Sequence, residues 1–470
     1  MSEKSSTNKN TGDVVIDVCG NTKDGQLKCP ACGASEMIPN PKTGKLRCNY
    51  CYTEFEGHKI KQDLDLFSLK GRVVGSGAVN INKDASSMVT LKCGGCGAEI
   101  VIDTSDAPHS RCHWCRSVLS INSKMENGSI PDVILPFSVR KEEAQNKIND
   151  FVKKRGFYAN KQFKKEFSTD NIMGVYFPYM LVDANCHATF KGEGEHLIRK
   201  YTVREGDSNT TYYDADAYSV ERDFDIVVDD LSIESNSKRA DKNDNSATNN
   251  IINSIMPFDT YNCIEYQSNY LIGYTSERRD VNIDDLSNKA KLQVLDIARH
   301  SINQDLSFYD RGVSWKNINV DIKGSKWISA YLPVWLYSYL ETKGSKKVIH
   351  YVAVNARTME TMGSVPVNIP LLFLVSAIIE IISIILGFSF CIASDEEISS
   401  IFIFLLPGIL YFVFIYARYR NQSARHVYER ETKNQISNIQ RVDSLIGRRN
   451  RLSSNIIRGK NNNKLEGDTK

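Results

Sequence analysis

The chain lacks the sequence motifs by which many enzymes are recognised. It contains no G-x-x-x-x-G-K-[ST] phosphate loop, no H-E-x-x-H motif and no nucleophile elbow. Its nearest glycine cluster, GSG at residues 75–77, has no lysine after it. Cys186, His187 and Asp183 lie inside a strand-like run and are expected to face the core or solvent. These absences predict a protein without enzymatic activity, with a hydrolase site formed only on folding as an alternative.

A secretory signal and a strong net charge are also absent. The formal charge is +3 over 470 residues, which by itself implies no acidic partner. The opening MSEKSSTNKN is polar and no apolar segment follows it, so residues 1–22 are expected to be disordered. In such a chain the 12 cysteines favour metal-bound thiolates in a reducing cytoplasm over a disulfide framework.

Eight of these cysteines form two copies of one pattern. Both copies have the spacing C-x2-C-x15-C-x2-C, and Gly33 and Gly97 follow the second cysteine, where a tight turn favours glycine. Because zinc prefers four thiolates in a tetrahedron, we expect two structural zinc ions, in zinc ribbons at residues 23–60 and 87–122. The predicted ligands are Cys29, Cys32, Cys48, Cys51, Cys93, Cys96, Cys112 and Cys115. Four thiolates leave no open position for catalysis.

Neither predicted ribbon is strongly basic. Residues 23–60 contain six Lys/Arg and four Asp/Glu, and residues 89–120 contain three of each. Binding to a phosphate backbone needs clustered cations, so nucleic acid is disfavoured as a partner and a protein partner is expected. A membrane-tethered regulator that binds nucleic acid through the ribbons and the C-terminal tail stays an alternative.

Residues 129–365 contain a second, weaker repeat. ILPF and YFPYML enclose one helical pattern, and IMPF and YLPVWL enclose another. The apolar faces of these two predicted helices are Ala144, Ile148, Phe151 and Val152, and Leu286, Ala290, Val294, Ile297 and Ile302. We therefore expect a duplicated α+β domain, with its prolines at strand entries or edges and a polar, mobile loop at residues 235–250.

Two long apolar runs follow this domain. Residues 369–393 contain one charge, Glu380, and are long enough to cross a hydrocarbon core of about 30 Å. A second run covers residues 401–417, so the sequence predicts a two-span transmembrane hairpin at residues 369–417, with a buried helical hairpin of a soluble core as the alternative. The acidic connecting loop has no Lys or Arg, whereas residues 418–470 contain 13 Lys/Arg and five Asp/Glu.

This charge asymmetry predicts a multi-pass protein of the cell membrane with both termini in the cytoplasm. The tail, residues 418–470, is expected to contain an amphipathic helix on anionic lipid. Glu380 should be protonated or paired, and Pro407 and Gly408 are expected to free a backbone carbonyl for it. Homo-oligomer contacts through the hairpin and a proton or ion relay are further interpretations of this carboxyl group.

CPACG followed by CNYC resembles the zinc ribbon of the transcription factor IIB type. Over most of residues 25–420 the layout is similar to bacterial membrane proteins that have such ribbons ahead of a soluble region and a transmembrane hairpin. The resemblance implies zinc and names no activity. The predicted protein is a scaffold, sensor or recruiter of protein partners at the inner face of the membrane.

Overall fold

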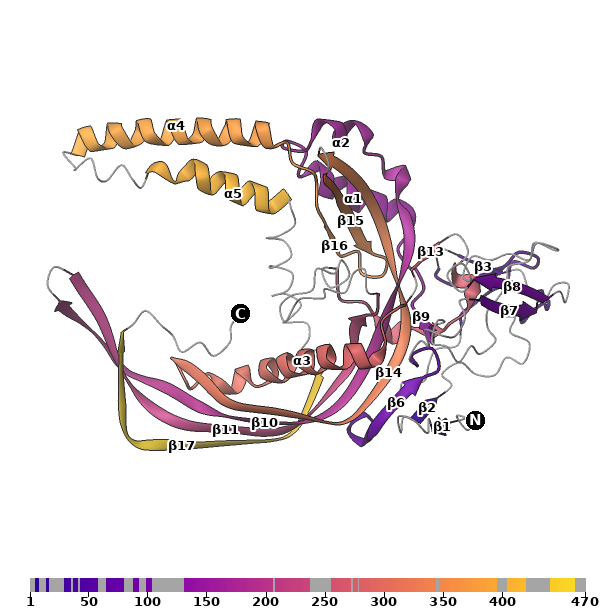
Figure 1. Cartoon of the computed structure of the whole chain (residues 1–470), viewed down its shortest axis with the longest axis horizontal. Coiled ribbons are helices and arrows are strands. Elements are labelled where there is room, and N and C mark those ends of the chain that lie inside the picture. Colours follow the sequence, from indigo (N-terminus) through magenta and orange to yellow (C-terminus); the bar gives the residue numbers. More distant parts are fainter. Residues whose placement is uncertain are drawn as a thin grey trace.

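The fold is organised around one long, strongly curved β-sheet, with helices at one end and along its concave side and a small zinc-ribbon-like unit at one side (Figure 1). It is known here from a computed structural model. The described residues are 5–7, 14–16, 29–34, 37–40, 43–57, 65–79, 88–92, 99–103, 131–205, 208–236, 255–271, 274–277, 279–343, 346–394, 404–419 and 440–460.

Three very long strands form the body of the sheet: β10 (Met173–Glu205), β11 (Ser208–Glu234) and β14 (Gly312–Lys343). They are antiparallel, and β10 lies between β11 and β14. β17 (Gln440–Lys460) adds to the outer edge of β11. The shorter strands of this sheet are β1 (Ser5–Thr7), β2 (Val14–Ile16), β6 (Gly71–Gly75), β9 (Val133–Ile134), β12 (Ile264–Glu265), β13 (Thr275–Ser276), β15 (Lys346–Asn355) and β16 (Thr361–Gly363).

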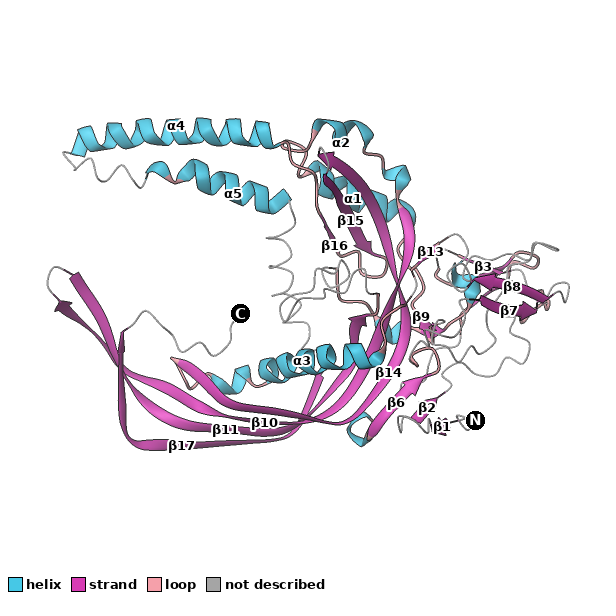
Figure 2. Cartoon of the chain, in the orientation of Figure 1, coloured by secondary structure: helices cyan, strands magenta, loops and turns pink. Residues whose placement is uncertain are grey.

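The alternation of side chains along β10 explains why the middle of the sheet is buried on both faces. Its even-numbered residues from Met180 to Phe190 pack with α3 (Ile283–Ser301), whereas Val175, Phe177, Tyr179 and Leu181 enter a cluster on the opposite face. Figure 2 shows α3 on the concave side of the sheet. The first layer covers β10, β11 and β14 on the side of α3, and the second covers β10, β14 and β15 on the other side.

The two predicted amphipathic helices are confirmed. In α1 (Lys141–Lys153) Ala144, Ile148 and Val152 are buried, and Phe151 packs against the same cluster. In α3 the predicted face is buried along its whole length. A short helix, α2 (Lys161–Glu166), follows α1. Periodicity of 3.6 residues was sufficient evidence for both long helices.

The duplicated α+β domain is wrong, because the two motifs that suggested it belong to one ladder of a large mixed sheet. Tyr176 pairs with Pro333, and Pro178 pairs with Tyr331. On its other side, β10 pairs with β11 only from Tyr179 onward, so Pro178 lies just before that ladder. In the same way, β14 pairs with β15 only from Val334 onward, so Pro333 lies just before that ladder. The prolines therefore avoid a ladder position where an N–H is required.

The two-span hairpin is also wrong. Within the described residues, one helix is long and apolar enough to cross a membrane: Ile369–Phe390, within α4 (Ile369–Ser394). The second helix, α5 (Pro407–Tyr419), has 13 residues and is about 20 Å long, less than a hydrocarbon core requires. It runs back along α4, because Phe404 lies against Gly387 and the Val365 N–H donates to the Tyr419 carbonyl.

Both ends of the chain also differ from expectation. Residues 1–22 were predicted to be disordered, but β1 and β2 pair with each other and β2 continues onto β6. Residues 440–460 of the tail form strand β17 instead of part of an amphipathic helix. The predicted loop at 235–250 lies outside the described residues from position 237 onward.

Candidate metal centre

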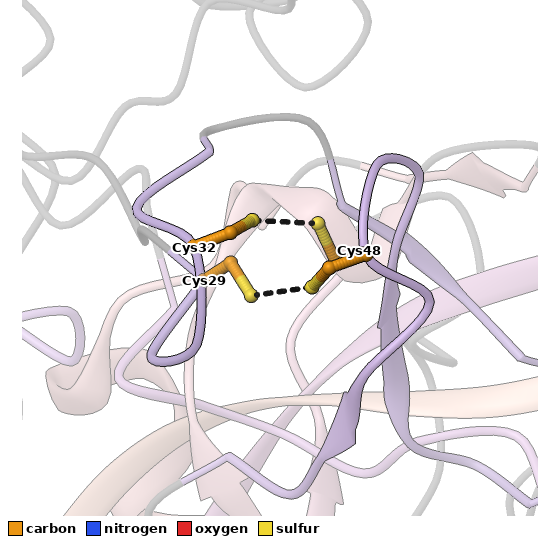
Figure 3. A group of neighbouring side chains, drawn as sticks. Cys29, Cys32 and Cys48 are labelled. Atoms are coloured by element: carbon orange, nitrogen blue, oxygen red, sulfur yellow. Dashed lines mark hydrogen bonds between the residues drawn. The ribbon is translucent and has the colours of Figure 1, made fainter.

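Four cysteines meet at the edge of a small three-stranded sheet. Cys29 and Cys32 precede β3 (Met37–Pro39), Cys48 ends β4 (Leu46–Cys48), and Cys51 precedes β5 (Glu54–Phe55). Figure 3 shows Cys29 and Cys32 on one turn, facing the turn that contains Cys48. The Cys29 and Cys51 sulfurs are 3.5 Å apart, and those of Cys32 and Cys48 are 3.6 Å apart. The first predicted ligand set is therefore brought together.

The two C-x-x-C segments adopt the same backbone turn. In the first, the Gly33 N–H donates to the Cys29 carbonyl, and in the second the Tyr52 N–H donates to the Cys48 carbonyl. Gly33 has φ +73° and Tyr52 has φ +59°, so both turns need the left-handed region. The Tyr50 N–H also points at the Cys48 sulfur, at 3.4 Å. Such turns aim both sulfurs of a pair toward one point.

The donor set fits a tetrahedral, soft metal ion. The four sulfurs all lie within 4.8 Å of one another. Sulfurs 2.3 Å from a central zinc would be about 3.8 Å apart, close to the two distances above. Because thiolates fill all four positions, a zinc ion here would stabilise the fold and have no open position for a substrate.

Hydrogen bonds make the thiols unequal before any metal binds. Contact with the hydroxyl and then the backbone of Thr53 lowers the pKa of Cys51 to about 6. Backbone N–H groups of Cys51 and Tyr50 help lower the pKa of Cys48. The Ala34 backbone acts in the same direction on Cys32, but the neighbouring thiols, that of Cys51 first, outweigh it and raise the Cys32 pKa to about 12. Metal binding would displace the protons that remain.

The unit is anchored to the body of the protein. Met37 is fully buried and packs with Cys29 and Cys48, while Leu46 joins the core around α1. The Asn269 side chain donates to the Met37 carbonyl at 3.3 Å. The metal site is therefore continuous with the main core.

The second predicted site, Cys93, Cys96, Cys112 and Cys115, lies outside the described residues. The nearby described strands are β7 (Met88–Lys92) and β8 (Glu99–Asp103), which pair antiparallel with Lys92 opposite Glu99. One four-cysteine cluster that could bind a metal ion is thus shown, and the second site stays a prediction.

The three residues considered for a catalytic site, Cys186, His187 and Asp183, lie in different environments. Cys186 is fully buried, and burial raises the pKa of its thiol to about 12. His187 lies on the other face of β10, with Nδ1 2.9 Å from Asp225 and Nε2 3.4 Å from Asp223. Asp183 accepts the Asp230 N–H at 2.9 Å and lies 3.5 Å from the Lys326 ammonium. These contacts give Cys186 no base.

Sequence reasoning missed a group of three carboxylates. Oxygens of Asp183, Asp229 and Asp230 lie within 4.8 Å of one another. Burial, followed by the Asp183 charge, raises the pKa of Asp230 to about 7. Asp230 has φ +51° at a register shift of β11, and adjacent aspartates at 229–230 were the signal available in the sequence. Because Asp183 already contacts the Asp230 N–H and the Lys326 ammonium, we interpret this group as part of the sheet structure.

The glycine cluster at 75–77 binds a protein carboxylate. Buried Asp132 accepts the Gly77 N–H at 2.6 Å and the Ser329 N–H at 2.9 Å. A Cβ on Gly75 would meet the Asp132 carboxylate, so glycine permits this close approach. The motif joins β6 to β14 through Asp132.

No protein-family model matches this chain, and no solved structure matches it. The chain is similar to YdjG of Bacillus subtilis (strain 168), an uncharacterized protein, with 23% identity over 238 residues. The similar region is 51% of this chain and 64% of that protein, so the chain spans less than two thirds of the length of its relative. The similarity supports a shared ancestry over about half of the chain and assigns no activity.

Proposed function

We propose that this chain is a non-enzymatic protein anchored in the cell membrane by α4, with a zinc ribbon of the transcription factor IIB type that recruits a protein partner at the cytoplasmic face. The observation that supports the anchor is the exposed apolar surface of α4. Nine of its large side chains from Phe373 to Phe390 are 48–67% exposed. Only 17% of its most apolar stretch is buried within the protein. Exposure of so large an apolar surface is unfavourable in water and favourable in the hydrocarbon core of a bilayer.

The contacts of α5 place its end beside the beginning of α4. α4 leaves the body near Asn368, and α5 ends beside the same place, where Val365 contacts the Tyr419 carbonyl. The basic tail, residues 418–470, therefore begins at the same end of α4 as the body of the protein. The basic composition of residues 418–470 favours the cytoplasm.

Insertion has a geometrical requirement. Figure 1 shows the far part of the long sheet extending in the same direction as α4. A flat bilayer crossed by α4 would also meet this part of the sheet, which contains charged side chains such as Glu193 and Lys200. Membrane insertion therefore needs a change in the angle between the α4–α5 pair and the far part of the sheet.

Alkaline carbonate extraction of membranes tests the anchor. The wild-type chain is expected to stay with the bilayer, whereas Ile381→Arg/Ile385→Arg should be released, because each arginine at a helix centre costs about 2.5–3.5 kcal/mol of insertion free energy. Ile198→Arg/Val203→Arg is the matched control, since these side chains are also exposed but lie on the sheet. Release of the wild-type chain by carbonate would contradict membrane anchoring.

The ribbon surface supports a protein partner more than a nucleic acid. Tyr50 is 67% exposed and Tyr52 is 64% exposed, with the Arg47 guanidinium 4.8 Å from the Tyr52 ring centroid. Exposed aromatic and arginine side chains are typical of protein-binding hot spots. Lys45 is paired with Glu56 at 3.3 Å, so this cation is already neutralised.

Recruitment is tested by crosslinked capture from membranes together with zinc analysis. Cys48→Ser/Cys51→Ser should lower the zinc content by one ion per chain and abolish capture, because zinc contributes about 10–16 kcal/mol of apparent binding energy to so small a fold. Tyr50→Ser should keep the zinc and lose the partner. If Tyr50→Ser keeps the zinc and captures the same proteins as wild type, this surface is not the docking site.

A further inference from the structure

The loop between α1 and α2 is fixed at the place where α4 begins and α5 ends. The Tyr158 hydroxyl is 2.7 Å from the Tyr411 hydroxyl, and the Tyr158 N–H donates to the Tyr419 hydroxyl at 3.1 Å. The Tyr158 carbonyl accepts the Asn368 N–H at 2.7 Å. Figure 2 shows α2 beside the beginning of α4. The loop therefore moves with the α4–α5 pair.

The outer surface of this loop and of the adjoining ends of α1 and α2 combines one large apolar side chain with several cations. Phe157 is 67% exposed, although its neighbour Tyr158 is buried. From residue 150 to residue 166 there are six Lys/Arg and two Asp/Glu. The exposed cations are Lys153, Lys154, Lys161, Lys164 and Lys165.

These lysines differ from those of the sheet. Within the described part of the chain, none of the five forms an ion pair with a carboxylate. On the sheet, by contrast, Lys191 pairs with Glu221 at 2.8 Å and Lys316 pairs with Glu193. A lysine face that leaves its charges unpaired is available to an external anion.

We propose that Phe157 and these five lysines form a binding surface for the headgroups of anionic phospholipids. The proposal rests on the proposed membrane anchor, because an inserted α4 places its first residues, and the loop bound to them, at the level of the headgroups. There an aromatic side chain enters the boundary of the acyl region, and long lysine side chains reach the phosphates. Each lysine near an anionic surface adds a favourable attraction that falls with salt.

This surface would also limit the tilt of the sheet relative to the membrane. One helix crossing a bilayer leaves the attached sheet free to tilt, whereas contacts beside the helix resist tilting. Arg155 extends the connection, because its guanidinium donates to the Phe151 carbonyl at 3.2 Å and lies 3.5 Å from the Arg418 carbonyl at the end of α5. The loop would thus set the orientation of the sheet relative to the membrane.

The test is the reactivity of individual lysines in the full chain. The protein is placed in nanodiscs of phosphatidylcholine alone or with phosphatidylglycerol, acetylated with an amine-reactive reagent and mapped by mass spectrometry. The five lysines should react about fivefold more slowly in the anionic nanodiscs, and high salt should remove the protection. Lys45 is the control, because the ribbon lies on the side of the body away from α4 (Figure 1), and its rate should not change.

A second variant separates this surface from unspecific attraction. Phe157→Ser should reduce the protection of the five lysines, and Tyr261→Ser, at an aromatic side chain that is 70% exposed elsewhere, should not. Recovery of the chain with both nanodiscs and equal lysine reactivity in both would overturn the headgroup surface and leave the anchor intact. Failure to recover the chain with either nanodisc would overturn both proposals. Protection by an added oligonucleotide and none by anionic lipid would assign the surface to nucleic acid instead.

Discussion

The two longest helices among the described residues, α3 and α4, have opposite relations to the rest of the molecule. α3 has one apolar face, and all of that face is buried against the concave side of the sheet. α4 is apolar on every side, and its large side chains stay exposed over most of its length. An amphipathic helix is satisfied by a protein core, whereas a helix that is apolar all round and not buried needs a different environment. This contrast is the main support for a membrane anchor.

The contrast is tested most strongly by placing one charge on each face of α3. Val294 is 1% exposed and Leu292 is 47% exposed. Val294→Asp should lower the free energy of unfolding by about 3–5 kcal/mol, because it buries an unpaired carboxylate. Leu292→Asp loses more helix propensity than Val294→Asp, yet it should change stability by less than about 1 kcal/mol, because its carboxylate stays in solvent.

Denaturation of the detergent-solubilised chain can be followed by tryptophan fluorescence, since Trp315 and Trp327 pack in the cluster beneath α3. Equal losses of stability for the two variants would show that α3 has no preferred face. A loss for Leu292→Asp that exceeds the loss for Val294→Asp would contradict the packing itself.

The same contrast explains which elements could be predicted from the sequence. The faces of α1 and α3 follow from periodicity, and the first four-cysteine cluster follows from cysteine spacing, because in both cases the pattern is local. The start of α5 is not local: residues 401–417 are one apolar run, yet the helix begins at Pro407. Its position depends on a contact with Glu380, which is 28 residues from Gly408.

The tail was misassigned for a similar reason. Apolar residues such as Leu445 and Ile446 are compatible with a helix, but the segment pairs with β11, where Glu221 faces Arg448 at 3.8 Å. The Arg449 guanidinium lies 4.0 Å from the Phe308 ring centroid. Both partners, Glu221 and Phe308, are more than a hundred residues away in the chain, so the sequence of the tail alone could not predict these contacts.

Glu380 is where the contrast between the two helices is least complete, because it is the one charged residue within residues 369–393. The sequence predicted that it would meet a freed carbonyl, and this is wrong: its carboxylate accepts the Gly408 N–H at 2.7 Å. That N–H belongs to the first turn of α5, where backbone donors have no partner within the helix. A Cβ on Gly408 would meet the Ser376 carbonyl and the Glu380 side chain. Glu380 therefore caps α5 from a neighbouring helix.

The smallest effect is expected from changing this cap. Glu380→Leu leaves the Gly408 N–H without an acceptor and should favour local opening of α5 by about 1–3 kcal/mol. Glu380→Gln keeps a carbonyl acceptor and should cost less than about 1 kcal/mol. Hydrogen exchange of peptides from residues 404–419, measured by mass spectrometry, reports this opening. If both variants exchange at the wild-type rate, the contact does not hold α5 against α4, and if glutamine is as harmful as leucine, the charge matters and the hydrogen bond alone does not suffice.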